Sequence, residues 1–246
     1  VPRQSDIYKV RDVIVAPEHY ALISADYSQA ELRLLAHYTQ DKFLIDTFKA
    51  GDDIHQATAD RVGLERSEAK RINFGIVYGM GVPETALQLN ISEQTAREYL
   101  DEYHKQIPGI RELYKEVEKR AMRSGYIRMW TGRRKHYDDL DETWKAMSNL
   151  IQGGVAELMR VAIMKLSHTL RGYNVRMLLQ VHDDVLFEVP EIEVKDRFKL
   201  IKDTMEDFDF NVPIRVEVKA GKSWGGAVPI EKSGYLPKQR ELDLGV

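Results

Sequence analysis

The sequence predicts an α+β domain in which an antiparallel sheet is interrupted by a long helical segment. A strand-like run, Tyr20–Ala25, comes early, and a second strand-rich block, Arg176–Val189 with Pro213–Val218, comes late. Between them, most segments up to about Leu170 have helical periodicity, with breaks at glycines and prolines. Strand, many helices and strands again is the order expected when helices are inserted between strands of one sheet.

Composition limits the kinds of protein and of site. The chain has 246 residues, of which 43% are hydrophobic and 30% charged, as in a globular domain with a sizeable core. Without cysteine, any metal must be held by oxygen or imidazole ligands. No apolar run approaches the roughly 20 residues of a membrane helix, and the start VPRQSDIYKV lacks the apolar core of a signal peptide. We therefore expect a cytoplasmic protein that is not secreted and has no membrane partner.

The individual elements follow from local patterns. The early strand leads into Asp26, and Gln29–Tyr38 then has the spacing of a helix. Ser92 and Glu93 are typical of a helix start, and Ile110–Met122 predicts another helix. In the late block, the amphipathic segment Lys195–Phe208 predicts a helix between two strands.

Two adjacent acids interrupt the apolar stretch LLQVHDDVLFEV, Leu178–Val189. Its flanks are typical of buried strands, so Asp183 and Asp184 fall at the tip of a hairpin. Burying an unpaired carboxylate is costly, so these acids must be solvated, paired or bound to a cation. A solvated acidic turn explains the pattern equally well, because Asp is a common turn residue.

Asp26 lies in a similar position, where an apolar strand meets the polar residues YSQ. If its strand pairs with the hairpin, Asp26 and Asp183 converge, and a hard cation such as Mg²⁺ stabilises that arrangement. Such a pair suits two-metal phosphoryl or nucleotidyl transfer. Two unrelated solvated turns are the alternative.

A third pattern lies in RSEAKRINFGIVYGMG, Arg66–Gly81. Arg66, Lys70, Phe74 and Tyr78 recur every four residues, so on a helix they form one stripe that begins with cations and ends with aromatic rings. The cations can hold a triphosphate, and the rings can stack on a base or sugar. A solvated cationic turn followed by two core aromatic residues is the alternative.

Positive charge is concentrated in one segment although the net charge is −3. Lys119–His136 contains seven Lys or Arg residues and no acid, interleaved with Tyr126 and Trp130. This is the composition of a track for a phosphate backbone. A solvated basic surface has the same composition, so both interpretations stay open.

Together these segments resemble the polymerase domain of family-A DNA polymerases, the group of bacterial DNA polymerase I and its phage relatives. DYSQAELR at Asp26–Arg33 is similar to motif A of that family, RSEAKRINFGIVYG to motif B, and QVHDDVLFE to motif C, in the same order. DDIHQATA at Asp52–Ala59, GRRKHYDDL near Gly132 and IQGGVAELM around Gln152 extend the resemblance over nearly the whole chain.

The resemblance implies a right-hand palm with a helical fingers insertion. Residues 1–40 would be the first part of the palm, 41–150 the fingers and 151–246 the second part of the palm. It implies a template-directed DNA polymerase that adds deoxynucleotides to a primer 3′-hydroxyl and releases pyrophosphate. The expected partners are primer-template DNA and dNTPs in replication or repair, at a nucleoid or on a phage genome. Thumb and exonuclease are absent from this sequence, so a separate chain or a further segment would supply them.

The resemblance also assigns the site residues. Asp26 and Asp183 would hold two Mg²⁺ ions, for which Mn²⁺ can substitute, and Asp184 and Lys70 would assist catalysis. Glu31 would exclude a ribose 2′-hydroxyl, Phe74 would pack on the incoming nucleotide and Tyr78 would lie at the template base. The remaining nucleotide-binding residues would line the triphosphate: Gln29, His55, Arg66 and Lys70. The residues expected on the primer-template are Arg33, Asn73, Gln152, His182, Arg133 and Arg134.

Two positions depart from the family pattern. The family usually has Glu after the motif C Asp, whereas Asp184 is one methylene shorter. Where relatives commonly have Asn, four residues before Gln152, this chain has Ser148. Two other functions are weighed against the polymerase: a nucleic-acid-binding module without catalysis, and a single-subunit RNA polymerase. The complete set of acids and cations argues against the first, and Glu31 against the second.

Overall fold

The computed structural model describes residues 10–235, which form two compact units. The sheet unit comprises residues 10–28, Val161–Asp207 and 215–235. The helical unit comprises Gln29–Arg160 and Phe208–Ile214. The helical insertion was expected at 41–150, whereas the helical unit already begins at Gln29. The reason is packing, because Leu35 and Ala36 of the first helix are buried in the hydrophobic core of the helical unit.

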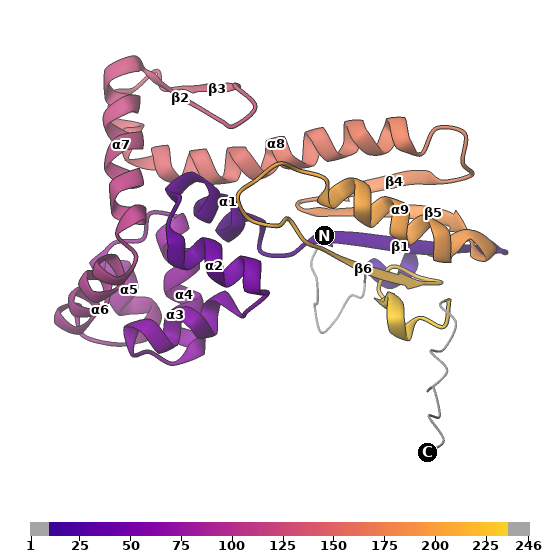
Figure 1. Ribbon diagram of the computed structural model, residues 1–246, viewed down its shortest axis with the longest axis horizontal. Coiled ribbons are helices and arrows are strands. Elements are labelled where there is room, and N and C mark those ends of the chain that lie inside the picture. The colour runs from indigo at the N-terminus through magenta and orange to yellow at the C-terminus, as the bar shows by residue number, and fades with distance from the viewer. Residues whose placement is uncertain (1–9, 236–246) are drawn as a thin grey trace. The chain divides into compact units, whose positions relative to one another are not determined.

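One five-stranded antiparallel sheet forms the sheet unit, in the order β4-β5-β1-β6-β7. This confirms the α+β class with an antiparallel sheet. The first strand of the chain pairs with strands from the late block on both sides, as the sequence order suggested (Figure 1). The strands are β1 (Tyr20–Tyr27), β4 (Arg176–Val181), β5 (Asp184–Pro190), β6 (Val216–Gly221) and β7 (Val228–Pro229).

The two faces of the sheet differ in chemistry because side chains alternate along each strand. Ala21, Ile23 and Ala25 of β1 are fully buried, and α9 (Val194–Glu206) packs against β1, β5 and β6. Tyr27 shares their face, and its hydroxyl donates to the carbonyl of Met205 on α9 at 2.8 Å. The opposite face of β1 presents Asp26, which is opposite Asp184 in the β1–β5 ladder.

Eight further helices span the middle of the chain (Figure 1). Their hydrophobic faces form the core of the helical unit, which includes Ile72, Tyr103 and Ile110. The last of them, α8, contributes its first part to the helical unit and its end to the sheet unit. The helices are α1 (Ala30–Thr39), α2 (Lys42–Ala50), α3 (Ile54–Val62), α4 (Arg66–Val77), α5 (Val82–Leu89), α6 (Glu93–Gln106), α7 (Pro108–Ser124) and α8 (Ala146–Thr169).

Short polar residues and glycines set the helix boundaries, and the sequence predicted this for Ser92 and for the glycines. Asp53 caps α3 by accepting from the amides of His55 and Gln56, and Ser92 caps α6 by accepting from the amide of Thr95 at 3.1 Å. Three of the expected glycine breaks are C-terminal residues in the left-handed region, which glycine adopts without a steric cost. These are Gly51, Gly63 and Gly125.

Two parts of the fold differ from the expectation. The basic segment contains a short hairpin, β2 (Tyr126–Arg128) with β3 (Arg134–His136), which the periodicity did not indicate. Three residues per strand are too few for a visible alternation, although Ile127 is buried in a local core. The last predicted strand starts at Val216 rather than Pro213, because proline has no N–H for a ladder and the Pro213 carbonyl accepts from Arg33 at 2.6 Å.

Among the helices that the structure describes, none combines the length and the apolar character needed to cross a bilayer.

Replacing Ser92 by Ala should destabilise the chain by about 1 kcal/mol, because the amide of Thr95 loses its capping partner. The measurement is urea unfolding followed by circular dichroism. Ser92→Asn is the matched control, since Asn caps helices equally well, and it should lie within a few tenths of a kcal/mol of the wild type. Equal losses in both variants would show that the cap is not the cause.

Candidate active site

Two of the expected catalytic acids lie on neighbouring strands at the same end of the sheet. Asp26 is the penultimate residue of β1, and Asp183 belongs to the turn between β4 and β5. The amide of Tyr27, which follows Asp26, donates to the carbonyl oxygen of Asp183 at 3.1 Å. The strands carrying the two acids are therefore hydrogen-bonded neighbours, as the two-metal hypothesis required.

The turn itself is as short as a hairpin allows. Val181 pairs with Asp184, so only His182 and Asp183 connect the strands. His182 has a φ of 56°, in the left-handed region that two-residue hairpins need and that His adopts more readily than most residues. The turn leaves His182 exposed and Asp183 half-buried. Its geometry therefore presents Asp183 at the tip instead of burying it in the ladder.

Asp184 has a different environment from its neighbour. Its side chain is 5% exposed, its Oδ1 accepts from the hydroxyl of Ser24 at 2.8 Å, and its Oδ2 lies 3.9 Å from Nη1 of Arg11. The guanidinium of Arg11 stacks over the Trp224 ring at 4.1 Å. A charged group on the sheet face is tolerated because it is paired. Asp184 is thus engaged within the protein, which separates it from the two acids expected to bind metal.

The donor set of Asp26 and Asp183 fits Mg²⁺. Mg²⁺ usually takes one or two carboxylates and fills its remaining positions with water and phosphate oxygens. Within residues 10–235, no group of three or more His, Asp or Glu side chains has the arrangement of an all-protein metal site. Two carboxylates at a strand end therefore suit a cation that arrives with a phosphate ligand better than a structural metal.

The motif B residues lie on α4 in the helical unit. Arg66 and Lys70 are exposed, and Phe74 is half-buried, one helical turn further on. Tyr78 is the residue immediately after the helix, with a side chain 47% exposed. Gly75 permits a close approach, because a Cβ there would lie 2.1 Å from the terminal methyl of Met80. The cationic and aromatic stripe expected from the sequence is present up to the helix end.

Arg66 is paired with an acid that the sequence analysis did not single out. Its Nη2 lies 2.6 Å from Oδ2 of Asp53, and its Nε donates to the same oxygen at 2.7 Å. Desolvation raises the pKa of Asp53, but hydrogen bonds from Arg66 and from the amides of His55 and Gln56 outweigh it and hold the pKa below its usual range. Asp53 therefore stays ionised and neutralises Arg66.

His55, on α3, is buried beside this pair. Its ring centroid is 5.5 Å from that of Phe74. Burial lowers the pKa of His55, the charge of Asp53 opposes this, and Lys70 and Arg66 lower the pKa further. The imidazole is therefore neutral at pH 7. The helical unit thus gathers His55, Arg66, Lys70 and Phe74 in one place.

The motif A residues at the start of α1 differ in how deeply they are buried. Gln29 precedes the helix with a φ of 54°, and Glu31 lies in the first turn, where both are half-buried. Arg33 is 8% exposed, donates to the Pro213 carbonyl and stacks over Phe48 at 4.6 Å. These contacts of Arg33 are internal to the helical unit, and its expected place at the primer stays a prediction.

Asn73 lies in the interior of the helical unit. It is 1% exposed, and its amide is hydrogen-bonded to His55, Thr58 and Tyr103. These partners are internal to the helical unit, and the expected place of Asn73 near the primer stays a prediction. The burial could be predicted from the sequence, because Ala69, Ile72 and Ile76 place Asn73 on the apolar face of α4.

The remaining primer-template candidates lie on the surface of the helical unit. Gln152 is exposed on α8, and Arg134 is exposed on β3 with its guanidinium 4.6 Å from the Tyr126 ring centroid. Arg133 is 3.1 Å from Glu157, which also accepts from Arg160 and Thr131. Part of the basic segment is thus neutralised, so the track and the solvated surface both remain open interpretations.

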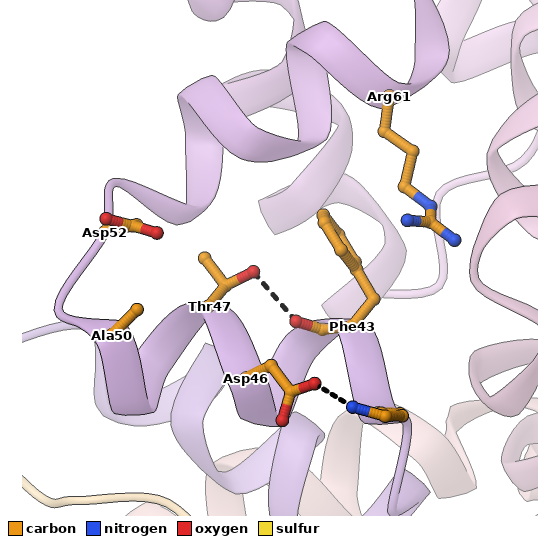
Figure 2. A pocket seen from close by; sticks show the side chains of 7 residues that line it. Phe43, Asp46, Thr47, Ala50, Asp52 and Arg61 are labelled. Carbon is orange, nitrogen blue, oxygen red and sulfur yellow. Dashed lines mark hydrogen bonds and ion pairs between the residues drawn. The ribbon is translucent and has the colours of Figure 1, made fainter.

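A shallow pocket elsewhere in the helical unit contains none of the expected residues. It lies between α2 and α3, has a volume of about 430 Å³ and is lined by Phe43, Thr47, Asp52 and Arg61 among others (Figure 2). Thr47 donates to the Phe43 carbonyl, and Arg61 stacks over the Phe43 ring at 4.4 Å. The pocket is therefore not counted with the candidate active site.

The family model described as DNA polymerase family A matches residues 1–226. The chain belongs to this family. Among curated relatives, DNA polymerase I of Lactococcus lactis subsp. cremoris is 35% identical over 238 residues, covering 88% of this chain and 27% of that protein. The thermostable DNA polymerase I of Thermus thermophilus is 34% identical over 235 residues, covering 88% of this chain and 28% of that protein.

A solved structure agrees with the family assignment. The POL domain of Pol1 from M. smegmatis, in complex with DNA primer-template and dNTP, superposes with a TM-score of 0.84 at 32% identity. The match covers 89% of this chain and 42% of that one. This family-A chain therefore has the fold of part of a polymerase domain, and it spans about a quarter of the length of the curated relatives it matches.

Sequence reasoning missed four residues of the site: Arg11, Asp53, Thr58 and Tyr103. Asp53 could have been found, because an Asp directly before a helical segment is a typical N-cap. Thr58 and Tyr103 contact Asn73 only through tertiary packing, and Arg11 reaches Asp184 across 173 residues, so no local pattern marks them.

We expect Asp26→Asn and Asp183→Asn each to weaken Mn²⁺ binding by at least about tenfold, because each removes one of the few charged ligands. The measurement is electron paramagnetic resonance of free Mn²⁺ during a titration. Asp184→Asn should bind Mn²⁺ nearly as tightly as the wild type, since Asp184 is held by Ser24 and Arg11. Loss of binding in Asp184→Asn alone would contradict the assignment.

Proposed function

We propose that this family-A chain is the catalytic core of a template-directed DNA polymerase, which adds deoxynucleotides to a primer 3′-hydroxyl with release of pyrophosphate. The observation that carries the proposal is the adjacency of Asp26 and Asp183, on hydrogen-bonded neighbours in the sheet of a chain that belongs to this family.

Asp26 and Asp183 are proposed to hold two Mg²⁺ ions, with Mn²⁺ as a substitute. When bound, Mg²⁺ activates the primer hydroxyl and neutralises the charge of the triphosphate. Asp184 is proposed to assist catalysis from beside those ions, with its negative charge offset by Arg11 and its Oδ1 held by Ser24. Electrostatic positioning supplies most of the catalysis, since phosphoryl transfer needs charge neutralised more than it needs a covalent partner.

The helical unit is proposed to bind the incoming nucleotide. Arg66 and Lys70 pair with phosphate oxygens, with Gln29 and His55 as neutral partners. Phe74 packs on the nucleotide, Tyr78 lies at the template base, and Glu31 excludes the 2′-hydroxyl of a ribonucleotide. Lys70 additionally assists the departure of pyrophosphate. The exposure of Arg66, Lys70 and Tyr78 supports this assignment, since all three are accessible to a ligand.

In this proposal the sheet unit is the palm and the helical unit the fingers, and closure of α4 on the nucleotide gates the reaction. Arg33, Gln152, His182, Arg133 and Arg134 are assigned to the primer-template. A thumb and an exonuclease would come from a further segment or a separate chain. Genomic DNA as template places the activity in the cytoplasm, at a nucleoid or a phage genome.

Primer extension tests the function directly. The 246-residue chain should extend a primed DNA template with Mg²⁺ and dNTPs in template order, and Asp183→Ala should reduce the rate by at least about a thousandfold. A chain that binds primer-template tightly but never extends it, with or without a thumb-containing partner, would instead be a binding module.

The Arg66–Asp53 pair has a consequence for substrate affinity. Both side chains are about half exposed, at 50% and 40%, and an exposed pair contributes at most about 1 kcal/mol. A triphosphate must displace Asp53 to reach Arg66, so Asp53 competes with the substrate. The free energy needed to break the pair is at most about 1 kcal/mol.

Asp53→Asn should therefore lower the KM for dNTP by about two- to fivefold with kcat unchanged, because it frees Arg66 by up to about 1 kcal/mol. Asn caps helices as well as Asp does, so α3 and His55 stay in place. The measurement is single-nucleotide incorporation at varied dNTP concentration. Asp52→Asn, which removes a neighbouring exposed charge that does not bind Arg66, serves as control and should leave KM within about twofold. A raised KM in Asp53→Asn would contradict the competition.

A further inference from the structure

A buried chain of polar side chains connects three helices of the helical unit. His55 and Thr58 belong to α3, Asn73 to α4 and Tyr103 to α6, and each residue is at most 2% exposed. Polar groups buried this deeply need hydrogen-bond partners with matching donors and acceptors. The donors and acceptors of these four side chains therefore determine which ring nitrogen of His55 carries a proton.

The hydroxyl of Thr58 has a single proton, which it donates to the carbonyl of Ile54 at 2.7 Å. Towards Asn73, 3.3 Å away, Thr58 can only accept. The Asn73 atom that faces Thr58 must then be the amide nitrogen, which is a donor. The Asn73 oxygen faces the other way and accepts from the hydroxyl of Tyr103 at 2.8 Å. Burial raises the pKa of Tyr103, so that hydroxyl keeps the proton it donates.

The second hydrogen of the Asn73 amide points at the imidazole. Its nitrogen lies 3.1 Å from Nδ1 of His55, and a donor there requires an unprotonated Nδ1. A neutral imidazole with an accepting Nδ1 has its only proton on Nε2. Among the described residues, no protein group is hydrogen-bonded to Nε2. Nε2 is also not one of the fully buried polar atoms without a partner, so its N–H keeps some exposure through which a ligand can reach it.

We propose that Thr58 and Asn73 are positioning residues that fix the tautomer of His55, so that Nε2 always carries a proton to donate to a phosphate oxygen of the nucleotide. The opposite tautomer would direct a lone pair at the phosphate and repel it. The ligand in this proposal rests on the proposed function, whereas the tautomer follows from the hydrogen bonds alone.

The charged groups around the ring are consistent with this arrangement. Asp53, Arg66 and Lys70 face His55, and the two cations disfavour an imidazolium while Asp53 favours it. The donating amide of Asn73 further opposes a proton on Nδ1. A neutral donor keeps the site from trapping the product, since it binds phosphate without adding a third positive charge to Arg66 and Lys70.

The test is the tautomer of His55, read from long-range ¹H–¹⁵N correlation spectra of protein labelled at histidine nitrogens, with His55→Gln to assign the signals. Between pH 6.5 and 8, we expect a protonated Nε2 and an unprotonated Nδ1. A wild-type ring protonated at Nδ1 overturns the proposal. This readout needs neither metal nor nucleotide.

Three variants of nearly unchanged shape test whether Thr58 and Asn73 fix the tautomer of His55. Thr58→Val removes the acceptor, so the Asn73 amide can rotate and both tautomers should appear, and Thr58→Ser should restore the single wild-type form. Asn73→Asp presents an acceptor to Nδ1 and should protonate it, so that the ring titrates at a higher pH than in the wild type. A Thr58→Val spectrum identical to that of the wild type overturns the role of Thr58, and an unprotonated Nδ1 in Asn73→Asp overturns that of Asn73.

Inorganic tripolyphosphate, added without metal, separates this inference from the proposed function. A shift of the Nε2 signal of His55, absent in Arg66→Gln with Lys70→Gln, is the expected result. If the expected tautomer is found but the Nε2 signal does not respond, Thr58 and Asn73 still fix the tautomer. Phosphate would then not be the ligand of Nε2, and His55 would lose its place in the proposed function.

Discussion

The antiparallel pairing of β1 with β5 is the constraint on which the rest of the sheet unit depends. Its register places Asp26 opposite Asp184 and brings the amide of Tyr27 to the carbonyl of Asp183. Because side chains alternate with a period of two, a slip of one residue would turn Asp26 towards α9 and take Ile23 off the face that packs against α9. The packing of β1 on α9 therefore fixes the position of the acids on the other face.

Concentrating carboxylates at one end of a sheet has an electrostatic cost, which the fold offsets with a distant residue. Arg11 lies 3.9 Å from Asp184 and stacks over Trp224, near the other end of the described chain. The hydroxyl of Ser24 satisfies the second oxygen. Asp184 is therefore held by Ser24 and Arg11, whereas metal binding is proposed for Asp26 and Asp183, so the two adjacent aspartates have different environments.

In the helical unit, too, a charged side chain is paired with one of opposite charge. Asp53 caps α3 and pairs with Arg66 of α4, so one carboxylate joins two helices and holds the cation proposed to bind the triphosphate. Beneath them, Asn73 connects α3, α4 and α6 through three hydrogen bonds. Exposed charge above a hydrogen-bonded polar core lets the surface respond to a ligand while the helices that carry it stay fixed.

The sequence by itself determined the elements and the chemistry they carry. Period-two and period-3.6 patterns are local, so they placed Asp26 at a strand end, the acids at a hairpin and Arg66, Lys70 and Phe74 along one helix face. Tertiary structure decided which partners these residues meet. Strand pairing, the contact of Arg11 with Asp184 and the contact of Arg33 with Pro213 depend on packing between residues far apart in the chain, which no local pattern encodes. The same holds for His55, whose motif fixes its position while the proton on its ring depends on Thr58 and Asn73 around it.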